Sequence, residues 1–361
     1  MKWKKGETSV SLSLSDIKLM AQCNMSFVEI LHRETHRTDI PPLWSVMSYA
    51  MLRYNGNVNG IWRYYRFLRD AAADTKKAYY HCQIPKANGG VRMLYIPYYA
   101  LQREQFFIMD TILAALPVDS HAYAYRKGVC MEQCAEPHVR KGVLIHLDIR
   151  DFFGSITEEM VQAVLCESTG YSRALCRFLA RMCCLNGCLP QGAVTSPMLS
   201  NIVFRRCDVA LTEFAQRYGL DYSRYSDDLF FSGSEDVDIK AVLKGVAEIL
   251  LPFGFRINTQ KTKIRKAQHR QSVLGLTVND HVQVNREYRR KLMQELYYLE
   301  RFGKNCEGAL ACGDYLKYMQ QLQGKLAYVM HTDPGNTGLL EAHLKLSQRL
   351  HNYARHVGTE Y

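Results

Sequence analysis

The sequence lacks the marks of several common protein classes. No apolar run reaches the roughly 18 residues needed to span a bilayer, and no apolar stretch follows the basic N-terminal residues, so a signal peptide is not expected. The twelve cysteines include no CxxC pair, which argues against standard zinc sites and redox dithiols. Internal repeats and low-complexity linkers are also missing. We therefore expect a cytoplasmic globular protein without membrane contact, whose cysteines are mostly reduced and buried.

Acidic residues are in the minority. Asp and Glu number 35 against 46 Lys and Arg, which gives a formal net charge of +11. A basic excess favours a polyanionic partner and carries no information on fold, and basic proteins without such a partner are also common. At 361 residues the chain can bury a sizeable core and is expected to divide into two or three lobes.

Two adjacent carboxylates, Asp227 and Asp228, stand between the short apolar and aromatic runs 220–225 and 229–233. Such runs are typical of strands, so the pair is expected where a hairpin turns. Hairpin turns usually take Asn-Gly or Asp-Gly, and neighbouring carboxylates repel each other unless a cation lies between them. Mg²⁺ suits that role, because it is a hard ion held by carboxylates and substrate phosphates. A solvated acidic turn is the alternative.

A third carboxylate strengthens the metal interpretation. The apolar run 143–147 has strand character and ends on Asp148. A carboxylate at the end of a buried strand, together with a carboxylate pair on a hairpin, is the arrangement of a two-metal phosphoryl-transfer site. One ion lowers the pKa of the attacking hydroxyl and the other neutralises the leaving pyrophosphate. We predict that Asp148, Asp227 and Asp228 are catalytic and bind two Mg²⁺ ions.

The motifs around these carboxylates resemble those of reverse transcriptases, and most of all the retron type, which is related to group II intron enzymes. The segment 189–197, LPQGAVTSP, matches the Pro-Gln-Gly-x-x-x-Ser-Pro loop that precedes the long palm helix in both groups. Two retron motifs match in part. Cys134-Ala-Glu-Pro-His138 has Cys where retron enzymes have Asn, and Val273-Leu-Gly275 has Leu where they have Thr. These partial motifs fit either a divergent retron enzyme or a different bacterial reverse transcriptase.

The resemblance implies an α+β fold of the right-hand polymerase type. Its parts would be fingers, a palm made of an antiparallel sheet backed by helices, and a helical thumb. The implied segments are an N-terminal helical region 1–80, fingers 81–142, palm 143–166, a fingers/palm connection 167–195, palm 196–284 and thumb 285–361.

Local signals predict where some elements begin and turn. Ser155 and Glu158 have the spacing of a capping box at the start of a helix. Ser196 and Pro197 suit the N-cap and the first position of the long helix after the matched loop. A last hairpin before the thumb is expected to turn near Asp280, between two runs rich in valine.

The resemblance also assigns residues to the incoming nucleotide. Lys86 and Arg92 flank a hairpin turn that would fold over the triphosphate, a task that suits the donor fork of arginine. Phe153, five positions after Asp148, would pack against the sugar and leave no room for a 2′-hydroxyl. The other implied nucleotide contacts are Gln191, Gly192 and Lys261. A solvated basic hairpin and a core role for Phe153 are the alternatives.

Contacts with nucleic acid are expected at Tyr225 and at the start of the thumb. There the thumb cluster, which we define as Arg286, Arg289, Arg290 and Lys291, would face the backbone of a duplex. Under the alternative interpretation the cluster is only the solvated face of a helix.

The implied function is that of an RNA-directed DNA polymerase, a nucleotidyltransferase. It would use dNTPs to copy a dedicated structured non-coding RNA into single-stranded DNA, primed from a 2′-hydroxyl of that RNA. The RNA–DNA hybrid product (msDNA) would serve anti-phage defence in bacteria, with a separately encoded effector protein. Another bacterial reverse transcriptase, group II intron-like or defence-associated, is the first alternative, although no endonuclease or maturase segment is recognised. The second is a catalytically inactive RNA-binding protein, against which the three carboxylates argue.

Overall fold

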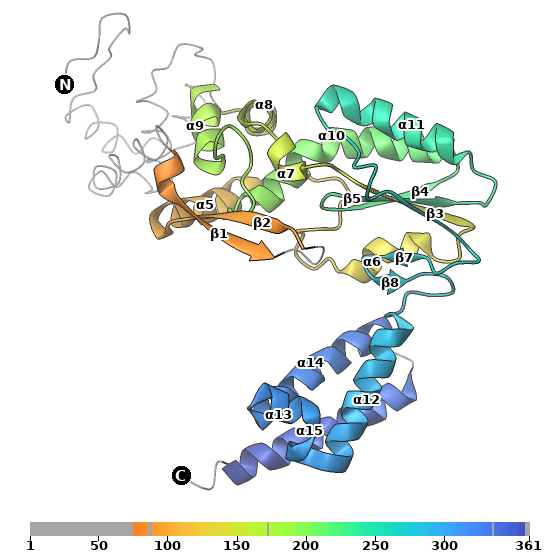
Figure 1. Ribbon diagram of the computed structural model, residues 1–361. Helices are drawn as coiled ribbons and strands as arrows, with labels where there is room; N and C mark the ends of the chain where they lie inside the picture. The colour runs from red at the N-terminus through yellow and green to blue at the C-terminus, as the bar shows by residue number, and fades with distance from the viewer. Residues whose placement is uncertain (1–74, 86–88, 172, 334–335, 358–361) are drawn as a thin grey trace, which may run out of the picture. The chain divides into compact units, whose positions relative to one another are not determined.

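The computed structural model describes residues 75–85, 89–171, 173–333 and 336–357. The helices predicted before residue 75 and the side chain of Lys86 lie outside these ranges. Figure 1 labels the helices and strands. The chain divides into two compact units, which are described separately. Unit 1 contains the described residues up to 127 with 148–214 and 243–258, and unit 2 contains 128–147, 215–242 and the described residues from 259 onward.

Unit 1 opens with the hairpin that the sequence predicted in the fingers. Its strands are β1 (Tyr79–Pro85) and β2 (Val91–Pro97), which pair in antiparallel register from Tyr79↔Pro97 to Pro85↔Val91. The elements around it are η1 (Thr75–Ala78), α5 (Tyr99–Thr111) and η2 (Leu113–Ala115). Most of the hairpin's side chains are exposed or half-buried. A two-stranded sheet is marginal alone in water, so this hairpin depends on what it docks against.

The rest of unit 1 is helical around an aromatic cluster. Phe152, Phe204 and Phe255 are buried, with ring centroids 4.9 to 5.9 Å apart. The cluster joins the short turn that follows Asp148 to the long helix 196–217 and to the chain at residue 255. The helices are α7 (Phe152–Ser155), α8 (Glu158–Thr169), α9 (Arg173–Cys183), most of α10 (Ser196–Arg217), the later part of α11 (Ile239–Leu250) and η4 (Leu251–Phe253).

Two predicted helix starts are wrong by one or two residues. Ser155 ends the short helix α7, and α8 is capped instead by Thr157, whose hydroxyl accepts the backbone N–H of Met160 at 3.3 Å. The carbonyl of Thr195 accepts the first helical bond of α10, so Ser196 lies inside the helix. The Ser196 hydroxyl donates to the carbonyl of Pro190 at 2.7 Å, which fixes the preceding loop.

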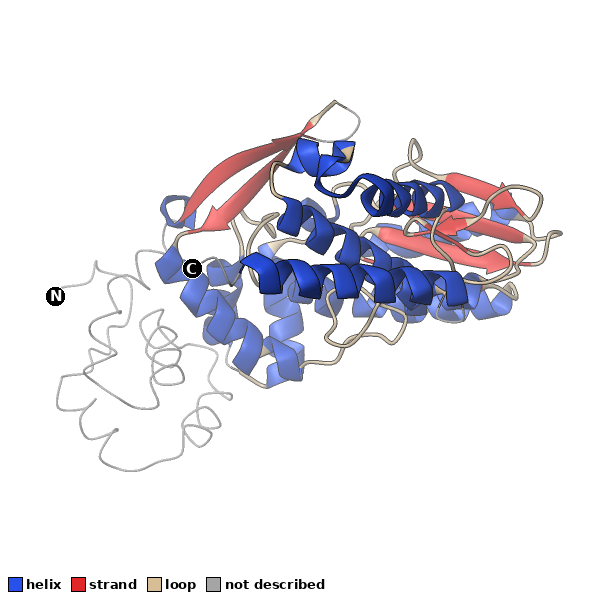
Figure 2. Ribbon diagram, turned by 90° about the horizontal axis from the view of Figure 1, so that it is seen from below, coloured by secondary structure: helices blue, strands red, loops and turns tan. Residues whose placement is uncertain are grey.

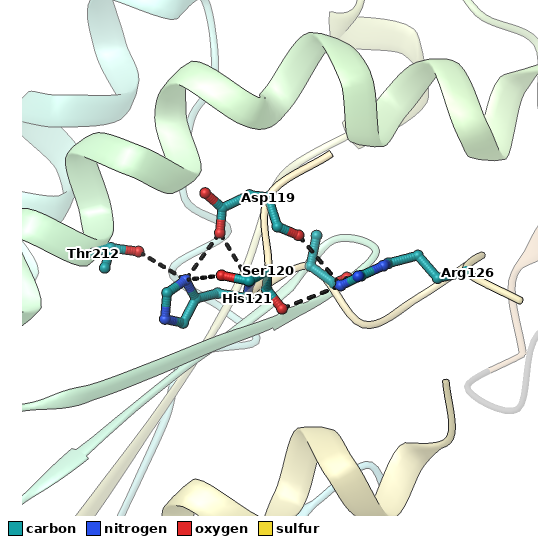
Figure 3. A network of polar contacts seen from close by, with 6 residues as sticks. Asp119, Ser120, His121, Arg126 and Thr212 are labelled. Atoms are coloured by element: carbon teal, nitrogen blue, oxygen red, sulfur yellow. Dashed lines mark hydrogen bonds and ion pairs between the residues drawn. The ribbon is translucent and has the colours of Figure 1, made fainter. Parts of the chain in front are cut away.

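A polar network in unit 1 joins the loop after η2 to helix α10 (Figure 3). Asp119 Oδ1 accepts the backbone N–H of His121 at 2.9 Å and lies 2.9 Å from its Nδ1. Thr212 Oγ1, on α10, lies 3.2 Å from the same Nδ1. Arg126 Nη1 donates to three carbonyl groups of the loop. These bonds fix a segment that has little regular secondary structure of its own.

Unit 2 is built on a four-stranded sheet in the order β4-β5-β3-β6. The β4–β5 and β3–β6 pairs are antiparallel. The central strands β3 and β5 are almost entirely buried, whereas β6 at the edge is mostly exposed. Buried central strands have continuous apolar sequences, which is why these two were recognisable. The four strands are β3 (Val143–Asp148), β4 (Asp221–Tyr225), β5 (Asp228–Gly233) and β6 (Lys263–Lys266).

Short helices back this sheet. His138 is fully buried, with Nε2 2.7 Å from Ser223 Oγ on β4 and Nδ1 2.7 Å from Ser232 Oγ on β5. The Ser223 hydroxyl also donates to the carbonyl of Cys134 at 3.1 Å. The partial motif at 134–138 therefore fastens both strands of the β4–β5 hairpin. The two helices, which contact β4 and β5, are α6 (Met131–Ala135) and η3 (Glu136–His138).

The hairpin predicted around Asp280 is corrected. Its main turn is Leu274-Gly275, between β7 (Ser272–Val273) and β8 (Leu276–Thr277), and the ladder around 280 is reduced to one bridge, Thr277↔Gln283. Leu274 and Gly275 have φ of 51° and 87°. Two consecutive left-handed residues make the short turn that matches the twist of paired strands.

The C-terminal part of unit 2 is helical, as predicted. Helix α14 contacts both α12 and α15, and the contact faces bury Leu292, Leu299, Leu322 and Leu326. None of the described helices is long and apolar enough to cross a membrane. The elements are α12 (Arg286–Phe302), η5 (Gly303–Asn305), α13 (Glu307–Cys312), α14 (Tyr315–Thr332) and α15 (Thr337–Val357).

The described cysteines are all free thiols, in agreement with the sequence analysis. Many are buried, among them Cys134, Cys176, Cys183 and Cys207. Burial raises the pKa of Cys183 to about 12 and that of Cys134 to about 12, because the charged thiolate loses its hydration. These side chains therefore act as small apolar groups.

Figure 2 shows strands limited to short ladders in a mainly helical chain. The predicted fold class is confirmed in its architecture: the protein is α+β, with an antiparallel sheet backed by helices and a helical C-terminal region. The exact limits of fingers, palm and thumb stay predictions.

Candidate active site

The β4–β5 hairpin turns where the sequence predicted. Tyr225 pairs with Asp228, so Ser226 and Asp227 form a two-residue turn. Ser226 has φ of 59°, a left-handed conformation that costs a residue with a Cβ free energy. Its carbonyl accepts from Nη1 of Arg224 at 3.1 Å, and this arginine is completely buried. The buried guanidinium therefore helps to hold the turn, a role that sequence reasoning did not find.

Asp228 has a partner that the sequence analysis missed. Its Oδ1 lies 2.6 Å from Nε2 of His146 on β3, and its side chain is 30% exposed. The His146 ring stacks on Phe230, with centroids 4.7 Å apart and planes inclined by 18°. The signal was present as one polar residue in the apolar run. It lies two positions before Asp148, and strand alternation puts residues i and i+2 on the same face.

Asp148 ends β3 and is 4% exposed. Its Oδ1 accepts from Nδ2 of Asn258 at 3.1 Å, and its carbonyl accepts the backbone N–H of the same residue at 2.7 Å. The amide orients one carboxylate oxygen. Asn258 lies in the segment that resembles the family's lysine motif, but only Lys261 was assigned there, so this positioning contact was missed.

Phe153 and Phe152 differ in burial. Phe152 is 3% exposed and belongs to the aromatic cluster of unit 1. Phe153 is half-buried, and its ring centroid lies 6.5 Å from that of Tyr125. Tyr125 has φ of 63°, so the backbone is held in a left-handed turn beside Phe153. The side-chain surface left on Phe153 is available to a ligand.

The matched loop docks on the fingers hairpin through its backbone. The carbonyl of Gln191 accepts the N–H of Tyr95 on β2 at 2.7 Å. Gly192 has φ of 111°, and a Cβ there would lie 2.9 Å from the carbonyl oxygen of Tyr95. Glycine is thus required by close packing, whatever contact it makes with a nucleotide.

The remaining predicted nucleotide contacts are placed separately. Arg92 is exposed on β2 in unit 1, and Lys261 is exposed just before β6 in unit 2. Tyr225 is half-buried at the end of β4. Lys86 lies outside the described residues. The contacts assigned to these four side chains remain predictions.

The thumb cluster lies on the first turns of α12 and is not uniform. Arg289 Nη1 lies 3.6 Å from Oδ2 of Asp333, and its side chain is 34% exposed. Arg286, Arg290 and Lys291 are exposed. Arg289 is therefore partly neutralised within the chain, so it has less charge to offer a phosphate than its neighbours.

The donor set at the carboxylates fits magnesium. Asp148, Asp227 and Asp228 offer hard oxygen ligands, and Mg²⁺ is usually held by one or two carboxylates with substrate phosphates. Cys130, Glu132 and His331 form a different group, with ligand atoms within 4.8 Å of one another in unit 2. Thiol and imidazole ligands suit a softer ion, so this second group is no substitute for the carboxylates.

Known proteins resemble this chain in sequence. Residues 84–278, more than half of the chain, match the family described as reverse transcriptase (RNA-dependent DNA polymerase). The retron Mx65 reverse transcriptase of Myxococcus xanthus is 32% identical over 293 residues, which cover 76% of this chain and 66% of the relative. The retron Ec86 reverse transcriptase of Escherichia coli is 27% identical over 244 residues, covering 67% of this chain and 72% of the relative.

Among solved structures, a foamy viral protease-reverse transcriptase bound to double-stranded DNA aligns with a TM-score of 0.40 and 16% identity, over 70% of this chain and 38% of that chain. The chain spans about two thirds of the length of the Mx65 relative. The family match and the retron relatives agree with the motifs found in the sequence. The chain belongs to the reverse transcriptase family and is of the retron type.

Proposed function

We propose that this protein is an RNA-directed DNA polymerase in which Asp148, Asp227 and Asp228 hold two Mg²⁺ ions. The strand order carries the proposal. Strand β5, which begins at Asp228, is the neighbour of β3, which ends at Asp148. That topology is what a shared carboxylate site at the strand ends requires. When bound, the ions would lower the pKa of the attacking hydroxyl and neutralise the leaving pyrophosphate.

The chain's own residues orient these carboxylates. Asn258 donates to one oxygen of Asp148, and His146, with its proton on Nε2, donates to one oxygen of Asp228. Arg224 holds the carbonyl of Ser226 and with it the turn. Groups fixed before substrate arrives need little reorganisation during the reaction. Phe153 would limit the space beside the sugar and so favour deoxyribonucleotides.

The finer proposal concerns the partner. We infer that a dedicated structured non-coding RNA supplies template and primer, that synthesis starts from one of its 2′-hydroxyls, and that the RNA–DNA product serves anti-phage defence with a separate effector. Similarity to several retron reverse transcriptases and the net charge of +11 support this. In this proposal β1–β2 belongs to the fingers, the four-stranded sheet to the palm and α12–α15 to the thumb.

The metal assignment is tested with Asp227→Asn and Asp228→Asn. Both variants should extend an RNA-templated primer orders of magnitude more slowly with Mg²⁺, because several kcal/mol of transition-state stabilisation is lost. The fold should survive, since removing one of two adjacent charges relieves repulsion. Asp221→Asn is the matched control, because Asp221 is at the other end of β4 and pairs with Lys141. Near-normal extension by both test variants would contradict the assignment.

The RNA partner is tested by sequencing nucleic acid that co-purifies with the protein. A single structured RNA joined to DNA through a 2′ linkage is expected. A diverse RNA population without attached DNA would contradict the retron proposal while leaving polymerase activity to the extension assay.

A further inference from the structure

A cavity of about 710 Å³ opens on unit 2 beside Asp228. Strands β3, β5 and β6 and the β7–β8 turn form its walls, and we refer to it as the β6 cavity. Its size lies within the roughly 300–1,000 Å³ typical of sites for small ligands. Asp228 and its partner His146 also line it, so the cavity adjoins the carboxylate site, but its other lining residues belong neither to that site nor to the thumb cluster.

The β6 cavity has a cationic side. Lys263, Arg265 and Arg270 line it, and none of the three makes an ion pair with a described carboxylate. Lys263 is opposite His146 in the β3–β6 ladder and Arg265 is opposite Leu144. Strand alternation therefore puts both cations on one face of the sheet. The three cations repel one another and outnumber Asp228, the carboxylate that also lines the cavity, so the site favours an anion.

The cations on the two faces of strand β6 differ in whether they have a carboxylate partner. Lys266 alternates to the other face, does not line the cavity, and lies 3.4 Å from Glu235. The cation on the outer face thus has a carboxylate partner, whereas the two on the cavity face have none. The charge that remains uncompensated is concentrated where a ligand can reach it.

The opposite side of the β6 cavity is apolar. Leu144, Phe230 and Leu274 line it. Leu274 has φ of 51°, an unfavourable backbone conformation for a bulky residue, and the turn holds its side chain at the cavity in spite of that cost. A bare inorganic anion would gain nothing from this wall. A nucleotide has both parts, a phosphate for the cations and a base and sugar for the apolar surface.

We propose that the β6 cavity binds one nucleotide of an RNA strand, with backbone phosphates on Lys263, Arg265 and Arg270. The cations form a row, because Lys263 and Arg265 are about 6.6 Å apart along an extended strand. That spacing suits the phosphates of neighbouring nucleotides in a strand, which a sugar separates, better than the directly linked and more closely spaced phosphates of a nucleoside triphosphate. The inference rests on the proposed function, since it takes RNA as the substrate, and it gives the sheet beside Asp228 a direct part in holding that RNA.

The test compares Lys263→Gln/Arg265→Gln with the control Lys266→Gln/Lys244→Gln, which removes the same charge. Lys244 is exposed on α11 and pairs with Glu248. Binding of a fluorescein-labelled RNA primer annealed to an RNA template is measured by anisotropy at several salt concentrations, without dNTPs. Each lost contact to a single strand should reduce the salt slope by about 0.7, so two should reduce it by about 1.4. If the electrostatic part vanishes near 1 M salt, binding at about 0.1 M weakens about 25-fold.

The control variant should bind within about twofold of wild type. A salt slope for Lys263→Gln/Arg265→Gln equal to that of the control would overturn the inference. Loss of binding to a fluorescent free nucleotide with unchanged RNA affinity would also overturn it, in favour of a free-nucleotide site. Primer extension by the wild type is followed separately, so an inactive wild type that still binds RNA through the cavity defeats only the proposed function.

A second variant tests the apolar side of the cavity without changing the charge and without an expected loss of stability. Leu274→Gly removes the Leu274 part of the apolar side, leaves Leu144 and Phe230, and relieves the left-handed strain, so thermal stability should hold or rise. RNA affinity should fall several-fold with an unchanged salt slope. Full affinity in this variant would contradict the assignment of a base or sugar to the apolar side.

Discussion

His138 has a hydrogen-bonding pattern that defines its protonation. Ser223 donates its hydroxyl proton to the carbonyl of Cys134, so the same hydroxyl accepts the Nε2–H of His138, and Nδ1 accepts the hydroxyl of Ser232. Burial lowers the pKa of His138 to about 4, because the charged ring would lose its hydration. The histidine is therefore neutral at neutral pH and acts as a fixed connector between the two strands.

This predicts a pH dependence of stability. The folded pKa is about 4 and the ordinary value is 6.5, so the unfolded chain binds the extra proton first. The stability that the neutral histidine contributes is complete above about pH 6.5. It is lost as the pH falls toward 4, which lowers the free energy of unfolding by up to about 3 kcal/mol. Urea unfolding at several pH values should show this fall in the wild type and a shallower one in His138→Gln. Equal pH slopes in the two proteins would contradict a buried neutral histidine.

Phe153 and its neighbour Phe152 allow a matched test of the predicted contact with the sugar of the nucleotide. Phe153→Ala should raise ribonucleotide incorporation relative to deoxyribonucleotide and change stability little, because the side chain is half-buried. Phe152→Ala should lower the free energy of unfolding by about 3–5 kcal/mol, because it empties part of the aromatic cluster. Competition between the two nucleotide types in primer extension, beside urea unfolding, separates these effects. Unchanged selectivity in Phe153→Ala would assign that ring to the core.

At the scale of elements, the β1–β2 hairpin and the loop 189–195 support each other. The hairpin buries little of its own, and the bond from Tyr95 to Gln191 gives it a second partner. Close approach at Gly192 makes this docking possible. An element that would be marginal alone becomes ordered through a backbone contact with a loop about a hundred residues away in sequence.

Gly192→Ala should therefore disturb more than a local turn. Left-handed strain alone costs about 1–3 kcal/mol, and the added Cβ would also press on the carbonyl of Tyr95. Gly187→Ala is the control, because Gly187 has φ of 79° and open space around it. Thermal unfolding should show a larger loss for Gly192→Ala than for Gly187→Ala. Equal losses would mean that the contact with β2 adds nothing.

Much of the fold could be predicted because its signals are local. Apolar runs defined β3 and the β4–β5 hairpin, the turn before Arg92 marked the β1–β2 hairpin, and the matched loop marked the start of α10 within one residue. The order of strands could not be predicted, because it depends on tertiary packing. The partners of the carboxylates were missed for the same reason: His146 and Asn258 lie far in sequence from Asp228 and Asp148 respectively. The cap predicted at Ser155 failed because Thr157, two residues later, offers a competing hydroxyl.

On the scale of the whole molecule, the charge of +11 is unevenly available. Some cations are neutralised within the chain, such as Arg289 by Asp333 and Lys325, which lies 2.7 Å from Glu295. Others, such as Arg290 and Lys291, are exposed on α12. Only charge that is not already compensated can displace counterions from nucleic acid, so the net charge overstates the number of phosphate contacts.

This distinction predicts unequal effects in the thumb cluster. Arg290→Gln should flatten the salt dependence of RNA binding by up to about one unit. Arg289→Gln should flatten it less, because its guanidinium already lies near Asp333, and it should cost at most about 1 kcal/mol of stability through the lost surface pair. Anisotropy titrations at several salt concentrations measure both slopes. A larger effect at Arg289 than at Arg290 would mean that RNA displaces the internal pair.

The buried thiols have a practical consequence for the native protein. The thiolate is the nucleophile that attacks a maleimide or a peroxide, and groups such as Cys134 and Cys183 are kept protonated and enclosed. Modification at these positions must therefore wait for the surrounding structure to open. Mass-spectrometric labelling over time would then act as a clock for local opening, read separately at Cys134 behind the β4–β5 hairpin and at Cys183 in unit 1.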